Sequence, residues 1–127
     1  MTPVIGSVRT WLRLEGLAVL VASLFFYRQQ SASWLLFAVL FLAPDLSMLG
    51  YIAGPRIGAA AYNIVHSYLL PLIFLFVAVL TAHSTLIPYA LIWTAHIGFD
   101  RLLGYGLKYP SAFGDTHLGR IGNQKAV

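Results

Sequence analysis

The sequence predicts an all-α, polytopic membrane protein whose four transmembrane helices form an antiparallel bundle, and three observations support this prediction. Of the 127 residues, 59% are hydrophobic and only 9% are charged, whereas soluble domains carry about 25% charged residues. Four apolar stretches each come close to the ~20 residues that a helix needs to cross a bilayer. Basic residues gather on one side of the predicted membrane. Residues 1–127 should therefore form a single transmembrane domain.

The four predicted spans follow one another with short connections. They cover residues 11–27, 34–52, 57–82 and 86–107. A polar loop, residues 28–33, closes the first span, and Gly54-Pro55 is a strong helix breaker after the second. The third span is long enough to tilt in a bilayer. Residues 108–127 are polar and contain glycine, which indicates a tail outside the membrane.

The distribution of charge predicts how the chain is oriented. Four spans place both termini and the loop after the second span on one side, which carries seven of the eight basic residues. These seven are Arg9, Arg13, Arg56, Arg101, Lys108, Arg120 and Lys125, and only Arg28 lies on the other side. Cytoplasmic loops are enriched in Lys and Arg, so both termini should be cytoplasmic. The net charge of +4 reflects this asymmetry, and we expect no nucleic-acid partner.

Asp45 is the most unusual residue of the second span, because it follows Pro44 inside a stretch that is otherwise apolar. A charged side chain within a membrane helix costs roughly 3 kcal/mol and usually faces protein or water. Pro44 has no N–H and disturbs the preceding turn, which frees a backbone carbonyl near Leu40. Neighbouring groups or water must satisfy that carbonyl. The pair therefore predicts a kink beside a small hydrated cavity.

Other polar side chains should lie at the level of Asp45. At about 1.5 Å of rise per residue, antiparallel threading places six of them in the cytoplasmic half of the membrane. They are Glu15, Asp45, Asn63, His66, His96 and Asp100. His96 and Asp100 are four residues apart and share a helix face, so the carboxylate can hold the imidazole directly. The opposite half holds almost no ionisable side chains, so the sequence predicts one site.

Three interpretations of this site are open at the level of sequence. Asp45, His66, His96 and Asp100 have the ligand types for a divalent metal ion, whereas the absence of cysteine excludes a thiolate site. The same residues, together with Glu15, could instead perform general acid–base catalysis, since histidine titrates near neutral pH. The third interpretation is a buried hydrogen-bond network that holds the helices in register and performs no chemistry.

The leading functional hypothesis is an enzyme that acts on a lipid-like or amphipathic small molecule reached from the cytoplasmic leaflet. In this hypothesis His66 and His96 are acid/base groups or metal ligands, and Asp45 and Asp100 orient them or share the metal. The predicted substrate-binding residues are Asn63, Tyr62 and Arg101. One alternative is a proton- or cation-coupled carrier, which four short helices could form only as a homodimer. Another is an accessory subunit whose polar network is purely structural.

Several motifs resemble those of a known family. They are Arg13-Leu-Glu-Gly16, Pro44-Asp-Leu-Ser-Met-Leu-Gly-Tyr51, Tyr62-Asn63 with His66, His96-Ile-Gly-Phe-Asp-Arg101, Gly104-Tyr-Gly-Leu-Lys-Tyr109 and Thr116-His-Leu-Gly119. Through them the chain resembles a bacterial family of small four-helix integral membrane proteins, catalogued as a domain of unknown function. The resemblance covers most of the chain and implies a protein of the bacterial inner membrane, in contact with its lipids. It implies no known activity, so no catalytic residue carries over from it.

Overall fold

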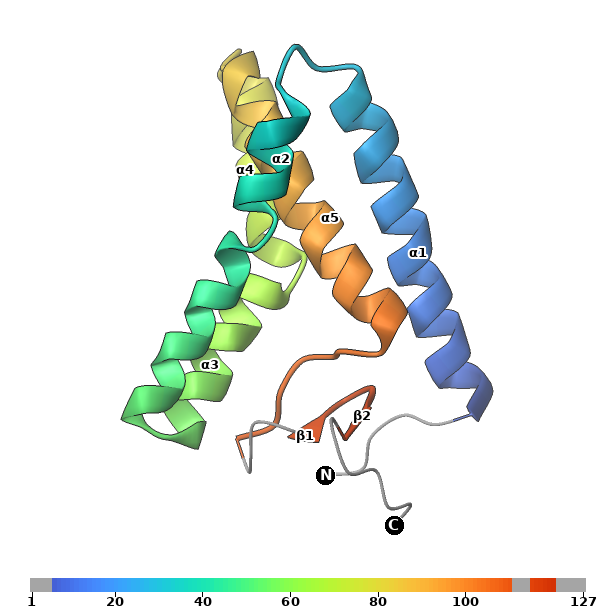
Figure 1. The fold of residues 1–127 in the computed structure, drawn as a ribbon, viewed down its shortest axis with the longest axis vertical. Helices are drawn as coiled ribbons and strands as arrows, with labels where there is room; N and C mark the ends of the chain where they lie inside the picture. Colours follow the sequence, from blue (N-terminus) through green and yellow to red (C-terminus); the bar gives the residue numbers. More distant parts are fainter. Residues whose placement is uncertain (1–5, 111–114, 121–127) are drawn as a thin grey trace.

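The computed structural model describes residues 6–110 and 115–120, and these residues are almost entirely helical (Figure 1). The α-helices are α1 (Gly6–Arg28), α2 (Trp34–Leu40), α3 (Pro55–His66), α4 (Leu69–Leu80) and α5 (Ile87–Leu103). Two 3-10 helices, η1 (Ala43–Ala53) and η2 (Ser84–Leu86), and a two-stranded antiparallel hairpin, β1 (Asp115–Thr116) with β2 (Gly119–Arg120), complete the described chain. The predicted all-α class is thus confirmed, apart from this short hairpin.

Three stretches of the described chain are long and apolar enough to cross a membrane. They are Gly6–Arg28, Trp34–Ala53 and Pro55–Leu80. The fourth predicted span, residues 86–107, is shorter than expected, because α5 has 17 residues. It ends where Gly104 adopts a left-handed conformation with φ 91°. There Gly104 N–H donates to Arg101 C=O and Tyr105 N–H donates to Asp100 C=O, which is the Schellman pattern of helix termination.

The second stretch is broken in the region that the sequence indicates. The α-helix α2 ends at Leu40, and the chain continues from Ala43 as the 3-10 helix η1. Pro44 stands in the first turn of η1, where its missing N–H is tolerated. Asp45 N–H donates to Leu42 C=O, which is the tighter 3-10 connection. Asp45 therefore begins a new helical segment instead of lying within a continuous one.

The third stretch is also broken, whereas the sequence analysis treated residues 57–82 as one span. The helix α3 ends at His66, and Ser67 is extended with ψ 154° before α4 starts at Leu69. The physical reason lies in Pro71, which has no N–H to offer the carbonyl of Ser67 and whose ring clashes with that carbonyl. Pro71 therefore acts on this span as Pro44 acts on the second, and His66 becomes the last residue of a helix.

The helix α5 is the core of the molecule. It contributes more buried residues than any other helix of the described chain, and the other helices lie around it (Figure 1). The helix α1 crosses it closely, because Gly16 faces Gly98 and neither has a side chain. A buried hydrogen bond of 2.8 Å joins Ser23 Oγ on α1 to Thr94 Oγ1 on α5. The position of the polar residues on α5 is thus tied to α1 through backbone contact.

Candidate metal centre

Four polar side chains from three helices meet at the two helix breaks. Asp45 comes from the first turn of η1, His66 from the last turn of α3, and His96 and Asp100 from α5. Their nearest nitrogen and oxygen atoms all lie within 4.8 Å of one another. His66 and His96 are buried, Asp100 is nearly so, and the Asp45 side chain is 37% exposed. The structure therefore brings together the four residues that the sequence predicts as metal ligands.

Five of the six ligand separations within this cluster are close to those of a tetrahedral metal site. His66 Nε2 and His96 Nε2 are 3.2 Å apart, and each lies 3.2 Å from Asp45 Oδ1. Asp100 Oδ2 lies 3.2 Å from His96 Nε2 and 3.6 Å from His66 Nε2. Zinc bonds to nitrogen and carboxylate oxygen of about 2.0–2.2 Å would separate ligands of a regular tetrahedron by about 3.3–3.6 Å. The ligand spacing therefore fits a zinc-sized ion.

The hydrogen bonds of the two imidazoles show which ring nitrogens are available to bind a metal ion. His66 Nδ1 lies 3.0 Å from the carbonyl oxygen of Tyr62. A carbonyl only accepts, so a neutral His66 carries its proton on Nδ1 and presents the lone pair of Nε2 to the cluster. Metal-ligating histidines usually donate their other ring N–H to a carboxylate, a backbone carbonyl or water, and Tyr62 C=O is such a partner. His96 Nδ1 is buried near the Phe41 backbone without a hydrogen bond of regular geometry in the described chain.

The broken end of α3 is completed by side chains of α5. Trp93 Nε1–H donates to Val65 C=O over 2.7 Å, and the Arg101 guanidinium donates to His66 C=O over 2.9 Å. Arg101 also donates to Tyr105 C=O over 3.0 Å and is only 7% exposed. These bonds satisfy carbonyls that would otherwise be unpaired at a helix end. Arg101, predicted as a substrate-binding residue, thus holds the α3 terminus beside the centre.

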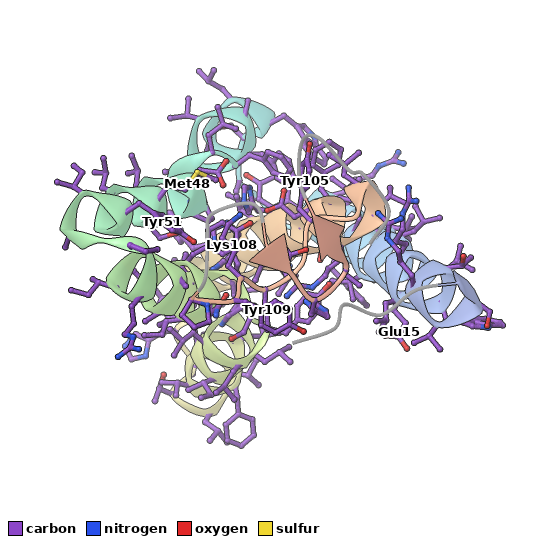
Figure 2. The ribbon with its side chains drawn as sticks, turned by 90° about the horizontal axis from the view of Figure 1, so that it is seen from below. Glu15, Met48, Tyr51, Tyr105, Lys108 and Tyr109 are labelled. Atoms are coloured by element: carbon purple, nitrogen blue, oxygen red, sulfur yellow. The ribbon has the colours of Figure 1, made fainter. Side chains whose placement is uncertain are left out.

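Tyr62 and Lys108 pack beneath His66. The Tyr62 ring stacks on the His66 ring, with centroids 3.7 Å apart and an interplanar angle of 6°. Lys108 Nζ lies 4.5 Å from the Tyr62 ring centroid. Lys108 is only 3% exposed, and Figure 2 shows it near the middle of the molecule when seen from below. Sequence reasoning missed Lys108, because its position depends on the path of the chain after α5.

Asn63 fixes that path. Its Nδ2 donates to Lys108 C=O over 2.8 Å, and Lys108 N–H donates to Asn63 Oδ1 over 2.6 Å. Asn63 and Tyr62, which the sequence analysis assigned to substrate binding, therefore contact the segment after α5 and the face of His66. An asparagine three residues before a buried histidine carries no sequence signal for such a clamp.

Replacing Asn63 by alanine should release the segment after α5. A buried backbone group left without its partner costs about 1–3 kcal/mol, and this substitution removes the partners of two such groups. We expect faster hydrogen exchange at the Lys108 amide and a lower melting temperature. Gln30→Ala is the control, because Gln30 is only half-buried and its amide makes only a long 3.4 Å hydrogen bond to Phe26 C=O. Unchanged exchange at Lys108 would contradict the role of Asn63 as a clamp.

Lys108 predicts a pH dependence of stability. Burial lowers the pKa of Lys108 from 10.5 to about 8, although the charges of Asp100 and Asp45 partly offset this effect. Between these values the unfolded chain binds a proton that the folded protein has lost, so the free energy of unfolding should rise with pH. Thermal unfolding at about pH 7.5 and about pH 9.5 should show this rise in the wild type but not in Lys108→Met. An equal rise in both proteins would refute the assignment to Lys108.

Glu15 is not part of the cluster. It is exposed on α1, and Figure 2 shows it at the edge of the molecule, away from Lys108. The reason is helical geometry, because its neighbour Gly16 faces α5 and one residue turns a helix by about 100°. The sequence predicts Glu15 at the level of the cluster, but in the structure its side chain lies on an exposed face of α1. It therefore cannot share the catalytic role predicted for the other four residues in this arrangement.

Comparison with known proteins identifies the family. The family model described as "Domain of unknown function (DUF4260)" matches residues 9–121. The chain belongs to the DUF4260 family. No curated protein and no solved structure matches the chain. The DUF4260 match includes all four cluster residues and Lys108, and its description assigns no activity. The chemistry must therefore be inferred from the site itself.

Proposed function

We propose that this DUF4260 protein is a small inner-membrane metalloenzyme, in which Asp45, His66, His96 and Asp100 hold a divalent ion of the zinc type. The supporting observation is that five of the six separations among the two imidazole nitrogens and the two carboxylate oxygens are 3.2–3.6 Å. The nitrogen–oxygen distances of 3.2 Å lie at the long end of the hydrogen-bond range of about 2.7–3.2 Å, whereas a charge-assisted bond between an imidazolium and a carboxylate is shorter, at about 2.7–2.9 Å. A central ion explains five similar distances at once.

The proposal places the protein in the bacterial inner membrane as four antiparallel spans, with both termini cytoplasmic. The spans would be α1, α2 with η1, α3 with α4, and α5. Figure 1 supports this arrangement, since these four segments run alternately up and down. The helix α5 has 17 residues, or about 25 Å at 1.5 Å per residue. This length is slightly below the ~30 Å hydrocarbon core, and η2 extends the segment.

Cysteine labelling tests this orientation. Single cysteines at Ser31 and Gly122 should react with a membrane-impermeant maleimide from opposite sides of the membrane, because positively charged termini remain cytoplasmic. The chain contains no other cysteine, so no background labelling is expected. Right-side-out cells should label the Ser31 variant, and inverted vesicles the Gly122 variant. Labelling of both positions from one side would overturn the four-span topology and the depths derived from it.

The chemistry follows from the exposure of one ligand. A structural zinc site is closed by four protein ligands, whereas a catalytic site keeps one position for water or substrate. Asp45 is 37% exposed while both histidines are buried, so Asp45 is the ligand that can move aside. The metal would then polarise a substrate oxygen or lower the pKa of a bound water. A displaced Asp45 would lie within reach to accept a proton, as a general base.

The direct test is conversion of an amphipathic substrate by metal-loaded protein. Wild-type protein reconstituted in vesicles of bacterial lipid extract, with and without zinc, should produce a zinc-dependent mass change in one class of molecule. Asp45→Asn should abolish the change, whereas Glu15→Gln, on an exposed face of α1, should retain it. Zinc binding without conversion of any amphiphile would remove the enzyme proposal and leave a metal-binding membrane protein.

One observation favours a second candidate, a proton- or cation-coupled carrier. Both breaks lie beside the cluster, and discontinuous helices near the membrane centre are typical of transporters. Four helices offer little room for alternating access, so the carrier would act as a homodimer. Proteoliposomes loaded with a zinc- or pH-sensitive dye distinguish the two candidates. Ion flux that Asp45→Asn abolishes, without chemical conversion, would support the carrier.

A further inference from the structure

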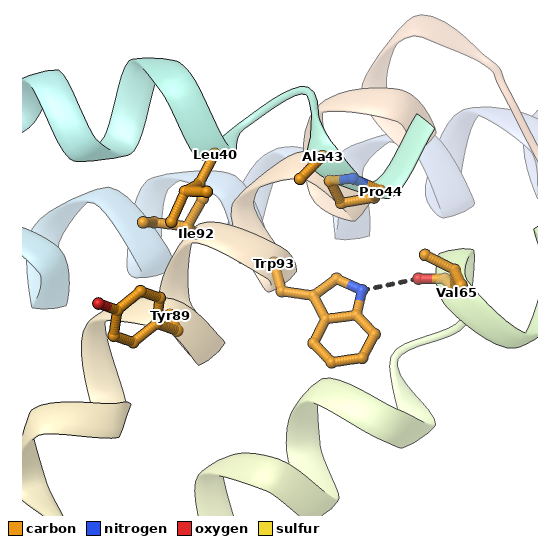
Figure 3. Close-up of a pocket in the computed structure, with 7 residues that line it drawn as sticks. All are labelled: Leu40, Ala43, Pro44, Val65, Tyr89, Ile92 and Trp93. Carbon is orange, nitrogen blue, oxygen red and sulfur yellow. Dashed lines mark hydrogen bonds between the residues drawn. The ribbon is translucent and has the colours of Figure 1, made fainter. Parts of the chain in front are cut away.

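Figure 3 shows the residues that line an apolar groove of about 350 Å³, among them the direct chain neighbours of Asp45 and His66. Residues of three segments line it, among them Ala43, Pro44, Val65, Ile92 and Trp93. Its size falls within the range of about 300–1,000 Å³ that is usual for small-molecule sites. It lies at the two helix breaks, where α2 ends at Leu40 and α3 ends at His66.

Each helix that contributes a metal ligand also contributes a groove residue within one helical turn of that ligand. Pro44 immediately precedes Asp45, Val65 immediately precedes His66, and Ile92 lies one turn before His96. A molecule lying in the groove would therefore have one end next to the cluster. That end would meet Asp45, the most exposed of the four side chains.

The lining offers almost no hydrogen-bonding partner. Trp93 Nε1–H and Val65 C=O satisfy each other over 2.7 Å, as the dashed line in Figure 3 shows. Beyond this pair, the polar side-chain atom of the lining is the hydroxyl of Tyr89. A polar ligand would lose its hydrogen bonds with water here without replacement. An alkyl chain loses none. In an amphiphile, an oxygen-bearing head group at the end of that chain would then contact the polar cluster.

We propose that the groove binds a single acyl chain of an amphiphile whose oxygen-bearing head group reaches the cluster. The proposal rests on the proposed function for the role of the head group, because oxygen donors are ligands for zinc. Binding of the acyl chain is independent of the proposed function, because it depends only on the shape and polarity of the groove. A long-chain carboxylate such as palmitate is the simplest molecule of this class.

Photolabelling with a palmitate that carries a mid-chain diazirine tests the proposal. Wild-type protein in phosphatidylcholine vesicles should be labelled on the peptides containing Ala43 and Trp93, severalfold above the exposed face of α4. Excess unlabelled palmitate should suppress the groove labelling and leave the α4 labelling unchanged. Equal labelling of both regions, or labelling that unlabelled palmitate does not reduce, would overturn the proposal.

Two variants localise the site. Ala43→Phe places a ring into the groove without replacing a ligand, and should reduce the groove labelling severalfold. Ala38→Phe adds the same ring at an exposed position of α2 outside the groove lining, and should leave the labelling unchanged. Similar labelling of the two variants would refute binding in the groove. A phosphatidylcholine diazirine that labels the groove as strongly as palmitate would show ordinary boundary lipid and would also refute it.

Zinc content measured on the same samples separates this proposal from the proposed function. Groove labelling that persists in Asp45→Asn protein, together with wild-type protein that binds no zinc, would leave the chain site standing and remove the metalloenzyme. Zinc binding without groove labelling that palmitate suppresses would leave the metal site standing and remove the acyl-chain site. Ala43→Phe should keep the zinc content of the wild type, because it changes no ligand.

Discussion

Purified His96→Gln and Asp45→Asn proteins are expected to lose bound zinc, whereas the wild type retains a single ion per chain. Loss of a residue that merely supports a ligand lowers metal affinity by about 10–100-fold, so loss of a ligand should lower it by more than about 100-fold. Both substitutions preserve hydrogen-bonding capacity. Because interhelical hydrogen bonds in membranes average about 0.6 kcal/mol, the metal-free variants should fold almost as stably as the metal-free wild type.

Thermal unfolding with and without added zinc checks both parts of this expectation. An ion present at about 100 times its Kd stabilises the folded state by about 2.7 kcal/mol, so zinc should raise the melting temperature of the wild type but not of the variants. Glu15→Gln is the matched control, since it removes a carboxylate at a similar depth on the exposed face of α1. Loss of folding in both variants, with no zinc effect on the wild type, would identify the cluster as structural.

Gly98→Ala is expected to destabilise the protein strongly, because the added methyl group meets the backbone of a neighbouring helix. An added Cβ at Gly98 would lie 2.7 Å from Gly16 O and 2.9 Å from Leu20 N. Both neighbours are backbone atoms of α1, so relief requires that the two helices separate. Overpacking in well-packed cores costs about 1–3 kcal/mol, and this contact cannot be relieved by rotating a side chain. The unfolding temperature in detergent measures the effect.

Gly16→Ala should behave in the same way, because its added Cβ would meet Gly98 O at 2.8 Å and Leu102 N at 2.9 Å. Ala22→Val is the control, since it adds apolar bulk at an exposed position of α1. Separation of α1 from α5 should also displace His96 and Asp100 and weaken zinc binding. Wild-type stability of both glycine variants would show that α1 and α5 are not held at this distance.

Much of the site can be predicted from sequence, because the helical rise and the threading of the helices determine the depth of each polar residue. The rise of about 1.5 Å per residue and the up-and-down threading of four helices place Asp45, His66, His96 and Asp100 at one depth. Their positions on neighbouring helices then bring them to within 4.8 Å of one another. The break at Pro44 follows from its missing N–H. The same reasoning applied to Pro71 would have indicated the break after His66.

Depth alone, however, does not decide which side of a helix faces the core. Glu15 lies at a suitable depth, but the backbone contact between Gly16 and Gly98 turns it outward. Arg101 was predicted to bind substrate because its charge lies near the cluster. Only the folded structure shows that its guanidinium donates to the carbonyls of His66 and Tyr105. Charge and depth cannot distinguish a ligand-binding arginine from one that completes a broken helix.

By itself the sequence thus determined the helical class and the four polar residues that converge, since these depend on composition and helical rise. Its motifs carry the likeness to the DUF4260 family. The tertiary structure alone decided that α5 is the buried centre. It also decided that Lys108 packs against the Tyr62 ring, which in turn stacks on His66. It also decided that the two helix breaks flank one apolar groove. These features arise from contacts between segments far apart in the chain, and neither periodicity nor composition encodes the rotation of one helix against another.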